Sequence, residues 1–363
     1  MSNLRVAPAT LFLGAGASRA FGFPTTKEFL QVLPDRLPFG KTRDLLTYLT
    51  NTPEITDIEH VLSILDQVVE LENPLLKYMA HHNVSMYMMA WKDFVDTATL
   101  LRASIRDELF RLYEFDPDKR DTIQSSYEEL LDDMCGNADC IHVFTTNYDS
   151  VVEEGLINSE KYLVIDGFRR KNSGAALWDS RILTRPKRTH RTKKHVFLHK
   201  LHGSLRWRLD KKSTDTIRVD TEEKAAEDSR MFAGNILLYP ASKVAPTAEP
   251  FGTLFSLFRR NLFASRKCIV IGFSFRDPYL NTVFVDFLRS SDLHAVFVIS
   301  PDADECLRNL ISDSTLSRLE HQTGTVKSRF GEIDIAADIQ KILAINVLPS
   351  RPHPTVTWEM KSH

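Results

Sequence analysis

The chain has 363 residues, of which 43% are hydrophobic and 26% are charged, and its formal net charge is −2. These values are those of an ordinary globular protein and argue against a molecule that binds a polyanion over its whole surface. The four cysteines lack C-x-x-C spacing, which excludes a zinc ribbon and gives no disulfide framework. Because the N-terminal residues do not form a signal peptide and no apolar run reaches about 18 residues, we expect a cytoplasmic protein with no membrane span.

Short apolar runs that end abruptly in small or polar residues recur along the chain. Runs of this length suit strands that are buried on both faces of a parallel sheet, and helix-like segments follow several of them. We therefore predict an α/β fold with a doubly wound, mostly parallel, Rossmann-like sheet. The expected strands are Thr10–Leu13, Ile141–Phe144, Val196–Leu201, Ile236–Tyr239, Ile269–Ile271 and Ala295–Ile299.

Residues 35–138 differ in character, because apolar residues there recur at helical spacing and strand patterns are missing. The stretch from Thr56 to Glu59, Thr-Asp-Ile-Glu, predicts a capping box at the start of one helix. We interpret 35–138 as a large helical insertion. The core domain would then consist of 1–34 and 139–346, with a C-terminal tail at 347–363.

Two polar stretches interrupt the second part of the core. Residues 166–195 are expected to be rich in loops, and residues 209–232 to be polar and exposed. Six of the ten residues in 185–194 are Lys or Arg. This basic run is either a local nucleic-acid or phosphate patch or a solvated loop near the mouth of the site, and we prefer the loop.

In doubly wound sheets, ligands bind outside the carboxyl ends of the strands, so the residues that follow each apolar run are candidates for chemistry. The first run leads into Leu-Gly-Ala-Gly-Ala-Ser, which ends at Ser18. Glycines at such a turn let the backbone approach a pyrophosphate, although a merely tight turn is the alternative. The third glycine of a dehydrogenase fingerprint is missing, and Asp35, near the spacing of a ribose-binding acid, does not follow a strand. A hydride-transfer enzyme is therefore disfavoured.

The second run is followed by Thr146, Asn147 and Asp149, which are suited to bonding ribose hydroxyls or positioning a water molecule. The alternative is that Asp149 caps the next helix. The third run is followed by His202, whose ordinary pKa suits general-base work near neutrality. By contrast, His199 lies inside the run, and we expect it to be structural and not a metal ligand.

Two later strand ends repeat the pattern of small and hydroxyl residues. Gly272-Phe-Ser274-Phe-Arg-Asp277 follows the fifth run, and Ser300 follows the sixth. Such residues can bound a nucleotide through backbone and hydroxyl contacts, and Ser300 would give a weaker ribose or adenine contact. A turn or a helix start is the alternative explanation for the motif at Gly272.

Taken in order, Gly-Ala-Gly-x-Ser, Thr-Thr-Asn-Tyr-Asp, His-Gly-Ser and Gly-Phe-Ser-x-x-Asp-Pro resemble the sirtuin-like family, especially its bacterial branch. The resemblance covers about residues 9–36 and 140–305. It implies that His202 is the catalytic base and that Asn147 orients the sugar or a water molecule. The NAD-binding residues expected from the resemblance and from the strand ends are Gly14, Ala15, Gly16, Ser18, Thr146, Asp149, Gly272, Ser274, Asp277 and Ser300.

Two departures from the protein-deacylating sirtuins bear on the reaction. The Asp-Phe-Arg that follows their glycine loop is replaced here by Thr25-Thr-Lys27, and their four-cysteine zinc module is missing. The chain is thus more similar to zinc-less sirtuin-like NAD glycohydrolases of antiphage defence systems. This resemblance implies an NAD hydrolase that takes NAD as its substrate, releases nicotinamide and ADP-ribose, and needs no metal.

Two other functions stay open. An ADP-ribosyltransferase or residual deacylase would use the same histidine with a different acceptor. A non-catalytic subunit that senses NAD or ADP-ribose is disfavoured because Asn147 and His202 are both present. The resemblance also implies a homo-oligomer and a separate regulatory partner, either a HerA-type ATPase or an Argonaute-like protein.

Overall fold

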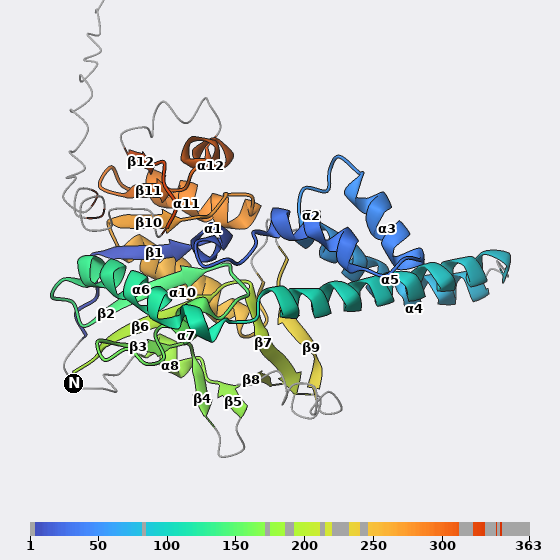
Figure 1. Ribbon diagram of the computed structural model, residues 1–363, viewed down its shortest axis with the longest axis horizontal. Coiled ribbons are helices and arrows are strands. Elements are labelled where there is room, and N and C mark those ends of the chain that lie inside the picture. Colours follow the sequence, from blue (N-terminus) through green and yellow to red (C-terminus); the bar gives the residue numbers. More distant parts are fainter. Residues whose placement is uncertain are drawn as a thin grey trace, which may run out of the picture.

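The computed structural model describes residues 4–81, 85–170, 175–185, 192–210, 215–219, 232–239, 246–311, 322–330, 339 and 342. At its centre lies a seven-stranded sheet with the order β12-β11-β10-β1-β2-β6-β3 (Figure 1). Every pair of neighbours in it is parallel. The strands are β1 (Ala9–Leu13), β2 (Cys140–Thr145), β3 (Tyr162–Ile165), β6 (Lys194–Lys200), β10 (Lys267–Ile271), β11 (Ala295–Ile299) and β12 (Thr323–Val326).

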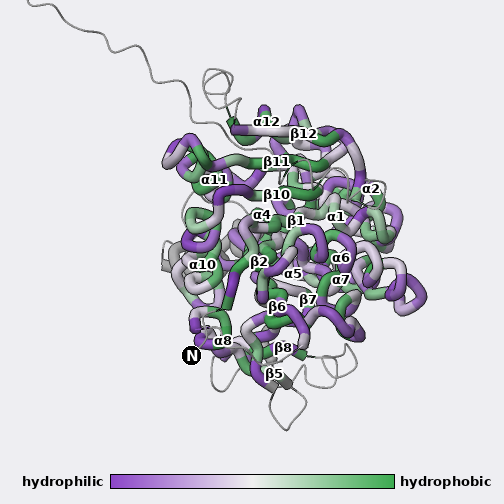
Figure 2. The backbone as a smooth tube through the Cα atoms, turned by 90° about the vertical axis from the view of Figure 1, so that its left-hand side faces the viewer, coloured by the Kyte–Doolittle hydropathy of each residue, from purple (hydrophilic) through white to green (hydrophobic). Residues whose placement is uncertain are grey.

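The sheet is covered on both faces, which confirms the predicted doubly wound α/β fold. Successive side chains of a strand point to opposite faces, so Leu11 and Leu13 of β1 enter one apolar cluster and Phe12 enters another. Helices α10 (Phe251–Ala264), α11 (Pro278–Ser290) and α12 (Ala303–Leu310) pack in the cluster that holds Phe12. Helices α6 (Arg120–Cys135) and α7 (Val151–Gly155) lie on the opposite side of the sheet (Figure 2). Burial on both faces explains why these strands are continuously apolar.

The strand order places a topological switch point between β1 and β10. After β1 the chain builds β2, β3 and β6 on one side, and it later returns to build β10, β11 and β12 on the other. The loops that leave the carboxyl ends of β1 and β10 therefore diverge, and such a divergence is where doubly wound sheets bind ligands.

All described elements between β1 and β2 are helices, as the apolar spacing predicted. They are α1 (Ala15–Arg19), α2 (Thr26–Arg36), α3 (Lys41–Thr50), α4 (Ile58–His81), α5 (Ser85–Leu112), the 3-10 helix η1 (Pro117–Lys119) and α6. The long helices α4 and α5 pack along each other and extend away from the sheet (Figure 1). The expected insertion boundary at residue 35 falls inside α2.

The capping box predicted at Thr56 is wrong. The carboxylate of Asp57 caps α4 instead, because its Oδ1 accepts the backbone N–H groups of Glu59 and His60 at 3.1 and 3.2 Å. Glu59 thus lies one position nearer the start of the helix than a capping box requires, and its side chain is left for another contact. A complete capping box is found at Thr25 of α2.

A second sheet of five antiparallel strands, with the order β4-β5-β8-β7-β9, was not predicted. The apolar run Ile236–Tyr239 was expected in the parallel sheet, but β9 ends at Leu237 and pairs with β7. A short apolar run fits a strand of either sheet, so periodicity alone could not decide this. The strands are β4 (Phe168–Arg170), β5 (Ala175–Trp178), β7 (Gly203–Asp210), β8 (Thr216–Val219) and β9 (Phe232–Leu237).

The two stretches expected to be loop-rich or exposed are also wrong in their described parts. Residues 166–195 supply β4, β5 and the short helix α8 (Arg181–Thr184). Within 209–232, Ile217 and Val219 of β8 are buried. Residues 186–191 of the basic run, residues 220–231 and the tail at 347–363 lie outside the described residues.

Two further observations concern the chain as a whole. In the described part, none of the helices combines the length and the apolar composition needed to cross a bilayer. The cysteines Cys135, Cys140, Cys268 and Cys306 are buried free thiols.

Gly272, at the end of β10, is expected to tolerate no side chain. Its φ is +65°, and an added Cβ would lie 2.3 Å from the backbone nitrogen of Ala17. Gly272→Ala should lower the free energy of unfolding by at least ~3 kcal/mol in urea titrations, because backbone strain and overpacking add. Gly136→Ala is the matched control, since its φ is +47° but nothing lies within 4 Å of the new Cβ. Equal losses in the two variants would contradict the close approach of the β1 and β10 loops.

Candidate active site

A cavity of about 590 Å³ opens at the carboxyl ends of β1 and β10. Residues from the loops after β1, β2, β6, β10 and β11 line it, together with the first turns of α2 and α4. Ten of the twelve predicted site residues lie in this lining, namely Ala15, Gly16, Thr146, Asn147, Asp149, His202, Gly272, Ser274, Asp277 and Ser300. The other two, Gly14 and Ser18, contact the side chain of Asn147 behind the cavity wall.

The glycines after β1 and β10 bring two backbones into contact. An added Cβ on Gly14 would lie 2.5 Å from the carbonyl oxygen of Gly272, and one on Gly16 would lie 2.7 Å from its Cα. The N–H of Gly16 donates to the Gly272 carbonyl at 2.9 Å. Small residues are therefore required here first by the packing of the two loops against each other.

Asn147 is fixed through one end of its amide group. Its Nδ2 donates to the carbonyl oxygen of Gly14 and to Oγ of Ser18, both at 3.0 Å. Its Oδ1 is buried and has no hydrogen-bond partner among the described residues. Because a buried polar atom without a partner is costly, this oxygen is a candidate for contact with a ligand.

His202 is held through one ring nitrogen. Its Nε2 lies 3.0 Å from Oδ2 of Asp277, whose Oδ1 caps α11 by accepting the N–H of Leu280 at 2.9 Å. A carboxylate only accepts, so Nε2 carries the hydrogen and Nδ1 keeps its lone pair. Nδ1 is buried and has no hydrogen-bond partner in the described part of the chain. The ring is thus oriented as a proton acceptor, and both oxygens of Asp277 are engaged within the protein.

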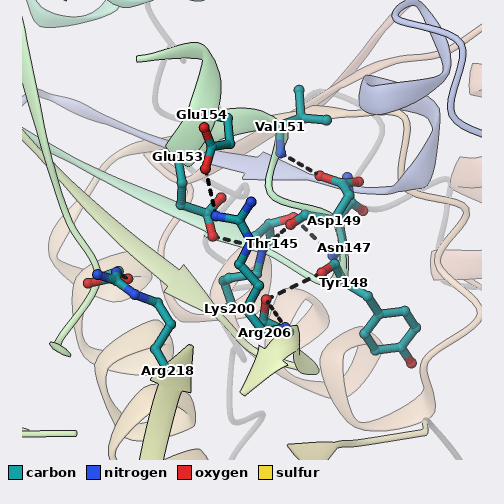
Figure 3. A network of polar contacts seen from close by, with 12 residues as sticks. Thr145, Asn147, Tyr148, Asp149, Val151, Glu153, Glu154, Lys200, Arg206 and Arg218 are labelled. Atoms are coloured by element: carbon teal, nitrogen blue, oxygen red, sulfur yellow. Dashed lines mark hydrogen bonds and ion pairs between the residues drawn. The ribbon is translucent and has the colours of Figure 1, made fainter. Parts of the chain in front are cut away.

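A buried lysine forms a hydrogen bond with the loop after β2. The ammonium group of Lys200, at the end of β6, donates to the carbonyl oxygen of Asp149 and lies 3.1 Å from Oε1 of Glu153. Figure 3 shows this network beside the pair formed by Arg206 and Glu154. The charge of Lys200 compensates a carboxylate that burial disfavours.

Asp149 was predicted either to contact a ligand or to be the N-cap of the next helix, but the N-cap of α7 is Ser150, one residue later. Oδ1 of Asp149 accepts the N–H of Val151 at 3.0 Å, at the start of α7, and Asp149 also lines the cavity. Burial raises the pKa of Asp149, and the nearby Lys200 ammonium opposes that change.

Glu59 of α4 was not predicted as a site residue, although it lines the cavity. Its Oε1 lies 2.7 Å from the hydroxyl oxygen of Tyr148 and 4.0 Å from Nδ1 of His202. Burial raises the pKa of Glu59 to about 7; the proximity of His202 opposes this, and the carboxylate of Asp57 adds to it. In the sequence, Glu59 was assigned to a capping box and was therefore not considered as a site residue. Its position beside Tyr148 and His202 depends on the fold.

Several other residues of the lining were also missed. Basic side chains, among them those of Arg19, Lys27 and Arg276, belong to this group. Arg276 stands inside the motif that follows β10, and Lys27 stands in the stretch that departs from the deacylases. Their positive charge was the signal that could have assigned them to a site for an anionic ligand.

The histidines inside the parallel sheet are structural, as expected for His199. Its Nε2 lies 3.0 Å from Nδ1 of His142, and both rings are buried. Burial lowers the pKa of His142 to about 4 and that of His199 well below its ordinary value, so the pair is neutral. No group of acidic, histidine or cysteine side chains within the described residues has the arrangement of a metal site.

Residues 141–321 match the family model described as the SIR2-like domain. The chain belongs to the SIR2-like family. The matched range begins in β2 and includes the loops of Asn147, His202 and Gly272. No curated protein gives a significant match.

Three solved structures illustrate the likeness. A Sir2 homologue in complex with NAD is 15% identical over 94% of this chain and 92% of that chain, with a TM-score of 0.39. A Sir2 complex with a p53 peptide and NAD+ is 12% identical over 93% of this chain and 92% of that chain, with a TM-score of 0.42. A structure described under sirtuin substrate affinity is 13% identical over 93% of each chain, with a TM-score of 0.39.

Replacing Glu59 by Gln is expected to change how stability depends on pH. Because the pKa of Glu59 is raised in the folded state, folding favours the protonated acid. The contribution of Glu59 to the free energy of unfolding is full below the ordinary carboxyl pKa and is lost as pH rises through about 7. The stability of Glu59→Gln relative to the wild type should therefore grow between about pH 4.5 and 7, by on the order of 1–3 kcal/mol, and then level off. Urea unfolding over this range measures it.

Glu108→Gln is the matched control for this experiment. Glu108 is a buried carboxylate of α5 that pairs with Arg36 and Arg111 away from the cavity. Removal of its charge should lower the free energy of unfolding at neutral pH, whereas Glu59→Gln should gain stability relative to the wild type as pH rises. A Glu59→Gln difference that is constant across pH would contradict the raised pKa.

Proposed function

We propose that this SIR2-like protein is an NAD glycohydrolase that cleaves NAD to nicotinamide and ADP-ribose. The observation that carries the proposal is a pair of polar atoms on residues that line the cavity, Oδ1 of Asn147 and Nδ1 of His202; both are buried and lack hydrogen-bond partners among the described residues. One is suited to hold a hydroxyl group or a water molecule, and the other to take its proton.

The cavity suits a dinucleotide in size, and part of its wall carries cationic side chains. Its volume of about 590 Å³ lies within the range of sites for small molecules and cofactors. The N–H groups of Gly14 and Gly16 donate to carbonyl groups of the protein. The glycine loop would therefore let the ligand come close to the backbone, and it does not offer these two N–H groups as donors. The side chains of Arg19, Lys27 and Arg276 would supply positive charge for the pyrophosphate.

The chemical step requires one proton acceptor. An O–H bond of the attacking water breaks, its proton passes to Nδ1 of His202, and its oxygen bonds to the anomeric carbon of the ribose. The bond from that carbon to nicotinamide breaks, and its electron pair stays on the nicotinamide nitrogen. In our proposal Asn147 holds the sugar or the water in line, and Asp277 keeps the ring in the tautomer that leaves Nδ1 free.

A role in antiphage defence, a homo-oligomer and a separate regulatory partner are also part of this proposal. They are supported by the similarity of the motifs to zinc-less NAD glycohydrolases of defence systems, where the activity is gated. The α4–α5 pair, which extends from the sheet, is a surface suited to such contacts (Figure 1).

Activity of the purified protein on NAD, with the products separated by chromatography, tests the hydrolase. The wild type should release nicotinamide and ADP-ribose, and His202→Ala should be slower by roughly 10²–10⁴-fold, because general-base help has that size. His294→Gln is a control, since His294 lies outside the cavity lining. Its rate should match the wild type, and circular dichroism should show that all three proteins fold.

The opposite results are equally definite. Full activity of His202→Ala would remove His202 from the reaction. A wild type that binds NAD without turnover, also after addition of lysate from phage-infected cells, would contradict the hydrolase and favour an NAD-sensing subunit.

A further inference from the structure

Glu59 reaches the active site from outside the parallel sheet, on the first turn of α4. Its backbone is held by Asp57, which accepts the N–H of Glu59 at 3.1 Å. Its side chain is only 14% exposed and lies among groups from other elements. The position of this carboxylate is therefore fixed by the helix that carries it.

The contacts of Tyr148 accommodate both protonation states of Glu59. The Tyr148 hydroxyl oxygen lies 2.7 Å from Oε1 of Glu59 and 2.9 Å from the carbonyl oxygen of Leu238. A hydroxyl has one proton, so it cannot donate to two acceptors at once. When Glu59 is protonated, it donates to Tyr148, and Tyr148 donates to Leu238. When Glu59 is ionised, Tyr148 donates to Glu59 instead.

The second neighbour of Glu59 is His202. Nε2 of His202 is engaged by Asp277, while Nδ1 has no hydrogen-bond partner among the described residues and lies 4.0 Å from Oε1 of Glu59. An anion at this distance favours the protonated imidazole in a buried site, where water screens charge poorly. The ionised and neutral forms of Glu59 therefore act differently on His202.

We propose that Glu59 is a positioning residue that acts through His202 and makes the reaction depend on pH near neutrality. Its ionised carboxylate stabilises the imidazolium that forms when Nδ1 takes the proton of the attacking water, and its protonated form, turned to Tyr148, does not. This inference rests on the proposed hydrolase and assigns to α4 a part in its chemistry.

The surroundings of Glu59 agree with this behaviour. The titratable and charged groups that act on it are Asp57 at the start of its own helix, Tyr113 after α5, Tyr148 after β2, His202 after β6, Tyr239 after β9 and Asp277 before α11. Burial raises the pKa of Glu59 to about 7, where a change of pH within the physiological range alters its charge. Two cations lie beside this group: Arg276, 4.0 Å from Asp57, and Arg106, which acts on Tyr239.

The test compares pH–rate profiles of NAD cleavage for the wild type and Glu59→Gln. At about pH 6 the two should be nearly equal, because Glu59 is then mostly neutral; at about pH 8 the variant should be slower by roughly three- to tenfold. Glu59→Asp keeps a carboxylate, so its rate of NAD cleavage should increase between pH 6 and 8 as that of the wild type does. Glu108→Gln, away from the cavity, should follow the wild type. A loss in Glu59→Gln that is the same at every pH would overturn the proposal, since a purely structural role predicts it.

A second measurement does not depend on activity. Urea unfolding of Glu59→Gln, His202→Asn and the double variant at about pH 8 gives the interaction between the two residues. Midpoint shifts that do not add support the inference, and additive shifts overturn it. If the wild type cleaves no NAD while the shifts are non-additive, the proposed hydrolase fails and the link between Glu59 and His202 stands.

Discussion

The contact between the β1 and β10 loops is the constraint on which the rest of the site depends. Gly14 and Gly16 lie against Gly272 so closely that no Cβ fits at any of the three positions. This contact joins the two loops at the switch point of the sheet, and the cavity opens beside it. The carbonyl oxygen of Gly14 then accepts from the Asn147 amide, so the glycine loop also fixes which end of that amide faces the cavity.

Buried hydrogen bonds next to this contact fix the neighbouring loops. Ser18 holds the Asn147 amide, and Lys200 holds the Asp149 carbonyl from the neighbouring strand. Lys200 is paired with Glu153, and Asp277 accepts the hydrogen bond of His202. Within the described residues, Oδ1 of Asn147 and Nδ1 of His202 have no hydrogen-bond partner, and both residues line the cavity. Buried polar atoms without a partner are costly, so such atoms on residues of the cavity wall are suited to contact with a ligand.

The sequence predicted the parts of the molecule whose environment is uniform. Leu11 to Leu13 and Ile269 to Ile271 are buried on both faces, so their apolar runs could be recognised without knowing the topology. Strand ends of a parallel sheet meet at one edge, which is why residues as distant as Gly16 and Ser300 could be assigned to one cavity. The antiparallel sheet was missed because polar residues interrupt its strands, as in β8, where Arg218 stands between the buried Ile217 and Val219.

Glu59 illustrates a different limit. A glutamate in the first turn of a helix has a sufficient local explanation, and its true neighbours are 89 residues away at Tyr148 and farther still at His202. Only the position of Glu59 beside the loops after β2 and β6 shows that His202 lies between two carboxylates, those of Asp277 and Glu59. Asp277 and the ionised form of Glu59 both stabilise positive charge on the ring. In the hydrolysis that we propose, cleavage of the bond from ribose to nicotinamide develops positive charge on the sugar. A cavity wall that supplies negative charge from two separate elements is suited to that transition state, because fixed charges need not reorganise as the bond breaks. On this argument the helical segment between β1 and β2 completes the electrostatics of the site, and a displacement of α4 would alter the chemistry without any change in the parallel sheet.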